Sequence, residues 1–124
     1  MANKECRTQQ KCKDMILPVS DAIQILSGKW KLPILISLQF GNKRFSEIAK
    51  GIPKITDRML SKELRELEMN QLVERTVYDT VPVTVEYSMT EYGESLDPVI
   101  MELAKWGKQH RKRIMSKDKP VATN

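Results

Sequence analysis

The chain has 124 residues, of which 40% are hydrophobic and 30% are charged, as expected for a single globular domain with a modest core. No apolar run approaches the roughly 20 residues needed to cross a bilayer, and the polar N-terminus lacks the apolar segment of a secretory signal. We therefore expect a cytoplasmic protein without a membrane partner. A formal net charge of +5 favours a polyanionic partner.

Residues 1–14 are predicted to form a flexible arm that carries both cysteines, Cys6 and Cys12. A structural disulfide is not expected in a cytosolic protein. The single histidine, His110, lies far along the sequence, so we expect no metal site. Basic neighbours of the cysteines favour thiolate chemistry, which leaves two interpretations: a redox-sensing pair, or exposed thiols without a role.

Two helices are predicted next. The first begins at Pro18 and ends near Leu26, with Ala22, Ile23 and Leu26 on its buried face. Gly28 separates it from a second helix whose residues 30–38 are apolar on nearly every side. That pattern is typical of a central core helix.

Residues 45–67 predict a short helix, a turn marked by glycine and proline, and a second helix over about residues 56–69. On the second helix, Leu60, Leu64 and Leu67 share one face, whereas Arg58, Lys62 and Arg65 lie on the opposite face. This is the arrangement by which a helix-turn-helix presents one helix to a DNA groove. A basic stripe can also be an ordinary solvated surface, but the preceding helix, the turn and the net charge favour DNA.

The candidate DNA contacts have different expected roles. Arg58 is the best candidate base reader, because arginine can bond a guanine edge with two hydrogen bonds. Lysines and Arg44 would position the protein on phosphates. The complete predicted set is Lys43, Arg44, Lys54, Thr56, Arg58, Ser61, Lys62 and Arg65.

Residues 73–89 change to a period of two, which predicts two strands, 73–78 and 83–89, in an antiparallel hairpin. Such a hairpin behind a helix-turn-helix is the wing of a winged helix. Its tip carries little positive charge, so the wing's part in DNA contact stays open.

A last helix is predicted from a cap at Thr90 to about Arg113, followed by a disordered tail over residues 114–124. Its apolar stripe would be exposed on a lone helix, although burial of each such side chain contributes about 1.5–3 kcal/mol. Either a second copy of the chain covers the stripe, or it folds back on its own domain. The predicted dimer-interface residues are Leu96, Val99, Ile100, Leu103 and Trp106.

Catalysis is not expected. His110 has no serine or cysteine partner suggested by local spacing, and the glycines occur singly, without a phosphate-binding loop. The sequence therefore predicts neither an enzyme nor a cofactor.

Over about residues 15–108 the chain resembles the HxlR-type family of bacterial winged-helix transcriptional regulators, in the MarR-like superfamily. The matching segments are PV (18–19), GKW (28–30), FGNKRFSEI (40–48), IP (52–53), ITDRMLS (55–61), LRELE (64–68), LVER (72–75) and VEY (85–87), with Thr90, Gly93 and Trp106. Many redox-responsive members carry a cysteine before the proline of the first helix. This chain has Leu17 there, so Cys12 does not simply inherit that role.

The resemblance implies an α+β, mainly α, winged helix-turn-helix over residues 15–113, with added terminal helices that form a dimer interface. It also implies a sequence-specific transcriptional regulator that acts as a homodimer on a pseudo-palindromic operator in double-stranded DNA. The sequence leaves open whether an effector, either a small molecule or a redox signal, acts on the protein. The alternative is a winged-helix docking module that binds protein and not DNA.

Overall fold

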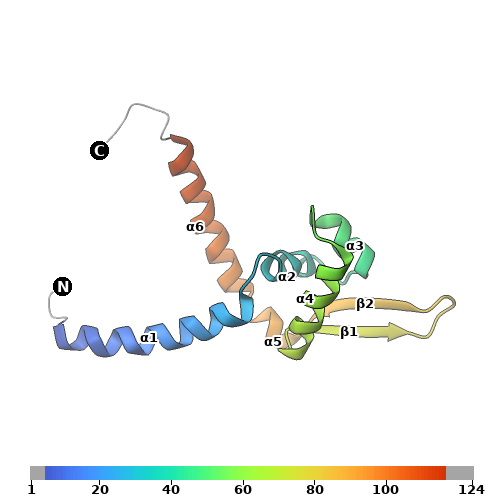
Figure 1. Cartoon of the computed structure of the whole chain (residues 1–124), viewed down its shortest axis with the longest axis horizontal. Coiled ribbons are helices and arrows are strands. Elements are labelled where there is room, and N and C mark those ends of the chain that lie inside the picture. Colours follow the sequence, from blue (N-terminus) through green and yellow to red (C-terminus); the bar gives the residue numbers. More distant parts are fainter. Residues whose placement is uncertain (1–4, 117–124) are drawn as a thin grey trace.

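The computed structural model describes residues 5–116, and side chains from residue 9 onward. It is mainly helical with one two-stranded antiparallel sheet, which confirms the predicted winged helix-turn-helix. Helices α2 to α4, the hairpin and α5 gather into one body, from which α1 and α6 project (Figure 1). The elements are α1 (Glu5–Leu26), α2 (Lys31–Gln39), α3 (Phe45–Gly51), α4 (Asp57–Met69), β1 (Val73–Tyr78), β2 (Thr84–Met89), α5 (Glu91–Glu94) and α6 (Asp97–Met115).

The core lies where α2, α3 and α4 meet. Helix α2 supplies Ile34 and Leu35, and α3 supplies Ile48, all without solvent exposure. The predicted leucine stripe of α4 is buried against them, and burial of each such side chain contributes about 1.5–3 kcal/mol. The central position predicted for residues 30–38 is confirmed, except that Ile36 faces solvent.

The hairpin forms as predicted, with Val73 opposite Met89 and Tyr78 opposite Thr84. A backbone bridge joins it to the segment before α3, because the Lys43 N–H donates to the Tyr87 oxygen (3.0 Å) and the Tyr87 N–H donates to the Lys43 oxygen (2.8 Å). The base of the wing is thus bonded to the start of the helix-turn-helix.

The junction between β2 and α5 needs a glycine. Thr90 caps α5, since its Oγ1 accepts from the Gly93 N–H (2.8 Å) and its hydroxyl donates to the Gln71 carbonyl (2.7 Å). A side chain at Gly93 would collide with the backbone oxygen of Leu72. The predicted cap at Thr90 is therefore confirmed. At this junction the backbones of Gly93 and Leu72 lie so close together that only glycine fits.

The helix predicted from Thr90 to Arg113 is in fact two helices. Helix α5 ends at Glu94, and α6 begins at Asp97 with Pro98 in its first turn. Proline has no N–H to continue a preceding helix but suits a helix start, which explains the break. Helix α6 continues through Met115, so residues 114 and 115 are helical and not part of a tail. Residues 117–124 lie outside the described part.

The N-terminal helix also differs from the prediction. Helix α1 begins at Glu5, so residues 5–14, expected to form an arm, are helical and Pro18 lies inside the helix. Residues 5–14 are rich in glutamate, glutamine, lysine and arginine, which favour helix, and the Gln10 amide donates to Asp14 one turn later (3.1 Å). The predicted buried residues Ala22 and Ile23 are exposed. No helix of the described part is both long and apolar enough to cross a membrane.

Candidate nucleic-acid interface

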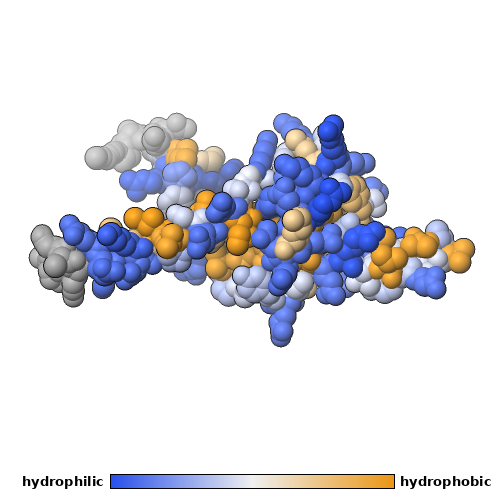
Figure 2. Space-filling model, turned by 60° about the horizontal axis from the view of Figure 1, so that its bottom comes forward, coloured by the Kyte–Doolittle hydropathy of each residue, from blue (hydrophilic) through white to orange (hydrophobic). Residues whose placement is uncertain are grey.

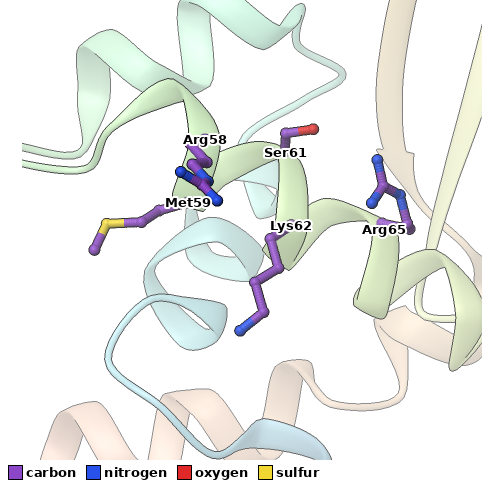
Figure 3. A pocket seen from close by; sticks show the side chains of 5 residues that line it. All are labelled: Arg58, Met59, Ser61, Lys62 and Arg65. Atoms are coloured by element: carbon purple, nitrogen blue, oxygen red, sulfur yellow. The ribbon is translucent and has the colours of Figure 1, made fainter.

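One face of α4 is buried and the other is basic. The side chains of Arg58, Ser61, Lys62 and Arg65 are exposed and line one shallow hollow of about 440 Å³ together with Met59 (Figure 3). Rotation of α4 about its own axis would expose the buried leucines on its other face. Their burial therefore fixes which side chains of α4 face solvent. The structure therefore brings together four of the predicted DNA contacts on a single face.

Thr56 begins α4, and its side chain has a structural use. Its Oγ1 accepts a hydrogen bond from the Met59 N–H at 3.1 Å, which is an N-cap. An N-cap of this kind contributes about 1 kcal/mol. The hydroxyl hydrogen can still be donated outward, so Thr56 can serve as both cap and contact.

Lys54 lies in the turn that joins α3 to α4. It is exposed, and its backbone adopts a positive φ of 72°. This left-handed conformation disfavours a residue with a side chain by roughly 1 kcal/mol, so the tight turn is maintained against local strain. The turn places Lys54 directly ahead of the basic face of α4.

Lys43 and Arg44 belong to a different part of the surface, at the start of α3. The backbone of Lys43 is fixed by the bridge to Tyr87, and its side chain is half-buried. Arg44 is exposed, and its N–H donates to Glu47 Oε1 at 2.8 Å. The structure does not bring these two residues into the hollow on α4.

A buried ion cluster that the sequence prediction missed holds α4 against α2. Lys31 Nζ lies 2.6 Å from Glu63 Oε1 and 2.6 Å from Glu66 Oε1. Lys31 is 7% exposed and Glu63 is 9% exposed. By its spacing, Glu63 lies on the same face of the helix as Leu60, Leu64 and Leu67. A carboxylate on an apolar face indicates a buried cation, and this sequence feature could have predicted the cluster.

The cluster changes the proton affinity of two of its members. Burial lowers the pKa of Lys31, but the hydrogen bonds and negative charges of Glu63 and Glu66 outweigh burial, so its pKa is raised. The hydrogen bond from Lys31 lowers the pKa of Glu66. Both charged forms are thus favoured in the folded state.

The terminal helices expose apolar side chains that nothing in the described chain covers. On α6, Val99, Leu103 and Trp106 are exposed, and the Trp106 ring stacks on His110 with centroids 5.0 Å apart. Ile100, predicted for the same face, is only 5% exposed and belongs to the core of its own domain, against which Leu96 also packs. Of the five residues predicted for the interface, Val99, Leu103 and Trp106 are thus the ones with exposed side chains.

Helix α1 adds a second exposed apolar face. Its members are Met15, Ile16, Val19 and Ile23, and Leu17 is exposed on another side of the helix. Figure 2 shows apolar side chains along this helix and at the wing tip. Cys12 is an exposed free thiol at helical spacing from Ile16, Val19 and Ile23. The side chain of Cys6 lies outside the described residues. No group of three or more possible metal ligands occurs among the residues described.

The wing tip is apolar and acidic. Val81 is fully exposed, Val77 and Val83 are more than half exposed, and the Tyr78 hydroxyl donates to Glu86 at 3.2 Å. The charge of Glu86 raises the pKa of Tyr78. The tip thus offers little that would attract a phosphate.

The comparisons with known proteins agree with this geometry. The model of the HxlR-like helix-turn-helix family matches residues 25–115. An uncharacterized HTH-type transcriptional regulator of Bacillus subtilis, YdeP, is 48% identical over 97 residues, which cover 78% of this chain and 76% of YdeP.

Two solved structures give the same picture. The redox regulator HypR in its reduced form has 41% identity and a TM-score of 0.75, covering 80% of this chain and 98% of its own. The reduced form of the B. subtilis transcriptional regulator YodB has 40% identity and a TM-score of 0.70, covering 77% of this chain and 93% of its own.

We expect Lys31→Met to lower the free energy of unfolding by about 3 kcal/mol, because it leaves the Glu63 carboxylate buried without its cation. Lys31 has a raised pKa, so its contribution is present below its unfolded pKa of about 10.4 and is lost as the pH rises through the folded value. Glu66 has a lowered pKa, so its contribution is present above about pH 4.3 and is lost as the pH falls through the folded value. Urea unfolding across this pH range measures both effects.

The matched control is Lys29→Met. Lys29 is exposed, and its Nζ lies 5.0 Å from the centre of the Trp30 ring, a contact that contributes at most about 1 kcal/mol. Equal losses at the two lysines would contradict the structural role of the buried cluster.

Proposed function

The chain belongs to the HxlR-like helix-turn-helix family of transcriptional regulators, and on that premise we propose that it binds operator DNA as a homodimer. In this proposal α4 enters the major groove of each half-site. The carrying observation is the exposed basic face of α4, opposite a fully buried leucine stripe. As a soluble regulator of transcription, the protein would act in the cytoplasm.

The proposed DNA contacts divide into residues that read bases and residues that bind phosphates. Arg58 lies in the first turn of the helix, where recognition helices contact base edges, and its guanidinium can bond O6 and N7 of a guanine. Ser61 and Arg65 follow along the same face. Lys43, Arg44, Lys54 and Lys62 would contact phosphates, each adding about −0.9 to the slope of log K against log salt.

The dimer is supported by the surfaces of α1 and α6. Leaving Val99, Leu103 and Trp106 in water, together with the apolar face of α1, forgoes burial of about 1.5–3 kcal/mol per large side chain. A two-fold dimer covers both faces at once and sets its two α4 helices on one side. The operator would then be pseudo-palindromic, with half-sites about 34–36 Å apart or a multiple of that.

The alternative, a docking module without DNA binding, is favoured by the wing tip alone. Its exposed valines and acidic residues suit a protein surface better than a phosphate backbone. The basic face of α4 has no use in such a module, so DNA binding is the better account of the whole surface.

A redox signal is the effector class that the comparisons favour, since HypR is described as a redox regulator. Cys12 is the exposed thiol among the described residues and lies on the apolar side of α1. Oxidation there would act through the terminal helices, which set the separation of the two reading helices.

Arg58→Ala should weaken binding to the operator by about 1–3 kcal/mol and reduce discrimination between operator and unrelated DNA. Fluorescence anisotropy with labelled fragments from upstream of the protein's own gene measures this. Lys54→Ala is the matched control and should weaken binding to all sequences alike. Wild-type binding that is equally weak on every fragment at physiological salt would favour the docking module.

Leu103→Glu should separate the dimer, because it places charge on the apolar face of α6. Sedimentation equilibrium should change from twice the chain mass to 14.3 kDa. Val81→Glu, at the fully exposed wing tip, should leave the mass unchanged. A wild-type protein that sediments as a monomer at micromolar concentration would refute the homodimer.

Cys12→Ser should abolish any loss of operator binding caused by a thiol oxidant such as diamide, while reduced protein binds equally well with either residue. The measurement is anisotropy before and after oxidation, followed by dithiothreitol. Oxidation that weakens binding in the serine variant as much as in the wild type would assign the response elsewhere.

A further inference from the structure

Glu66 lies between two lysines, one buried and one at the surface. Its Oε1 is 2.6 Å from Lys31 Nζ, and its Oε2 is 3.9 Å from Lys62 Nζ. Lys31 reaches it from beneath α4, whereas Lys62 reaches it from the basic face. The same carboxylate therefore joins the core of the domain to the surface proposed for DNA.

The two contacts differ greatly in strength. The contact with Lys31 is short and involves an ammonium whose side chain is 9% exposed, whereas the Lys62 side chain is 68% exposed. Exposed ion pairs contribute about 0–1 kcal/mol, and a short charge-assisted hydrogen bond to a buried ammonium is stronger, although Glu66 itself is half-buried. Glu66 is thus held by Lys31, and Lys62 is only loosely bound to it.

Helix α4 needs such an arrangement because of its own charge. Residues 57–69 contain three basic and four acidic side chains, an unfavourable balance for a helix near phosphates. Lys31 adds one positive charge from the inside, so the charges on and against α4 balance at four against four without use of the surface.

We propose that Lys31 is a positioning residue for DNA binding: by holding Glu66 from beneath α4, it leaves the Lys62 ammonium free to contact a phosphate. This inference rests on the proposed function and deepens it. Without Lys31, the Glu66 carboxylate would turn to its remaining partner, and Lys62 would have to give up that tighter ion pair before it could contact a phosphate.

The test compares the salt slope of operator binding among matched variants. Lys31→Met/Glu63→Gln removes the cation together with the buried charge that would otherwise be left unpaired. It should make the slope shallower, by up to about 0.9 per protomer if the whole contribution of one phosphate contact is lost. Adding Glu66→Gln should restore the wild-type slope, whereas adding Glu68→Gln, which removes the same charge from the same helix, should not.

Two further measurements keep the proposal falsifiable. Glu66→Gln alone retains Lys31 and should leave the slope unchanged, because Lys62 is only loosely paired with Glu66 in the wild type. A slope steeper by about 0.9 per protomer would show that Glu66 withholds Lys62 even when Lys31 is present, and would overturn the proposal. In DNA-free protein, acetylation of Lys62 followed by mass spectrometry should slow in Lys31→Met/Glu63→Gln and recover with Glu66→Gln. Equal rates in all variants would also overturn it.

These outcomes separate the two proposals. If wild-type protein does not bind DNA selectively, the proposed function fails whatever the acetylation rates are. If it binds selectively and the variants all share the wild-type salt slope, only the role of Lys31 fails.

Discussion

The contact between α2 and α4 is the constraint on which the rest of the structure depends. A helix that presents side chains to a groove must be fixed in rotation and tilt, and apolar packing alone permits small sliding adjustments. The Lys31 cluster limits such sliding of α4 along α2, because a buried lysine needs its acceptors at defined positions. Burial of these charges yields little net stability, but any displaced arrangement would leave a carboxylate without its partner.

Periodicity predicted the central part of the fold well. The leucine stripe of α4, the core position of α2, the hairpin and the cap at Thr90 all follow from local patterns that the tertiary structure keeps. The errors fall where a pattern is locally ambiguous. Proline is frequent at helix starts, but Pro18 lies inside α1. The apolar residues on both sides of Pro98 keep helical spacing, so the spacing did not indicate the break between α5 and α6.

The candidate interface shows the same division. The spacing of Arg58, Lys62 and Arg65 indicates a shared face, and the structure places them on one hollow. Spacing cannot show which neighbour covers an apolar residue. The stripe on α6 therefore predicts a dimer contact at Ile100, whereas its own domain buries this side chain. Nor can it pair Lys31 with Glu63 and Glu66, since the partners lie more than thirty residues apart.

The bridge between Lys43 and Tyr87 uses main-chain atoms only. It joins the wing to the start of α3 whatever side chain stands at position 43, except proline, which lacks the N–H. The backbone there is fixed by hydrogen bonds in which the side chain takes no part. A substitution of Lys43 by any neutral residue but proline would therefore change the charge beside α3 and leave the attachment of the wing as it is.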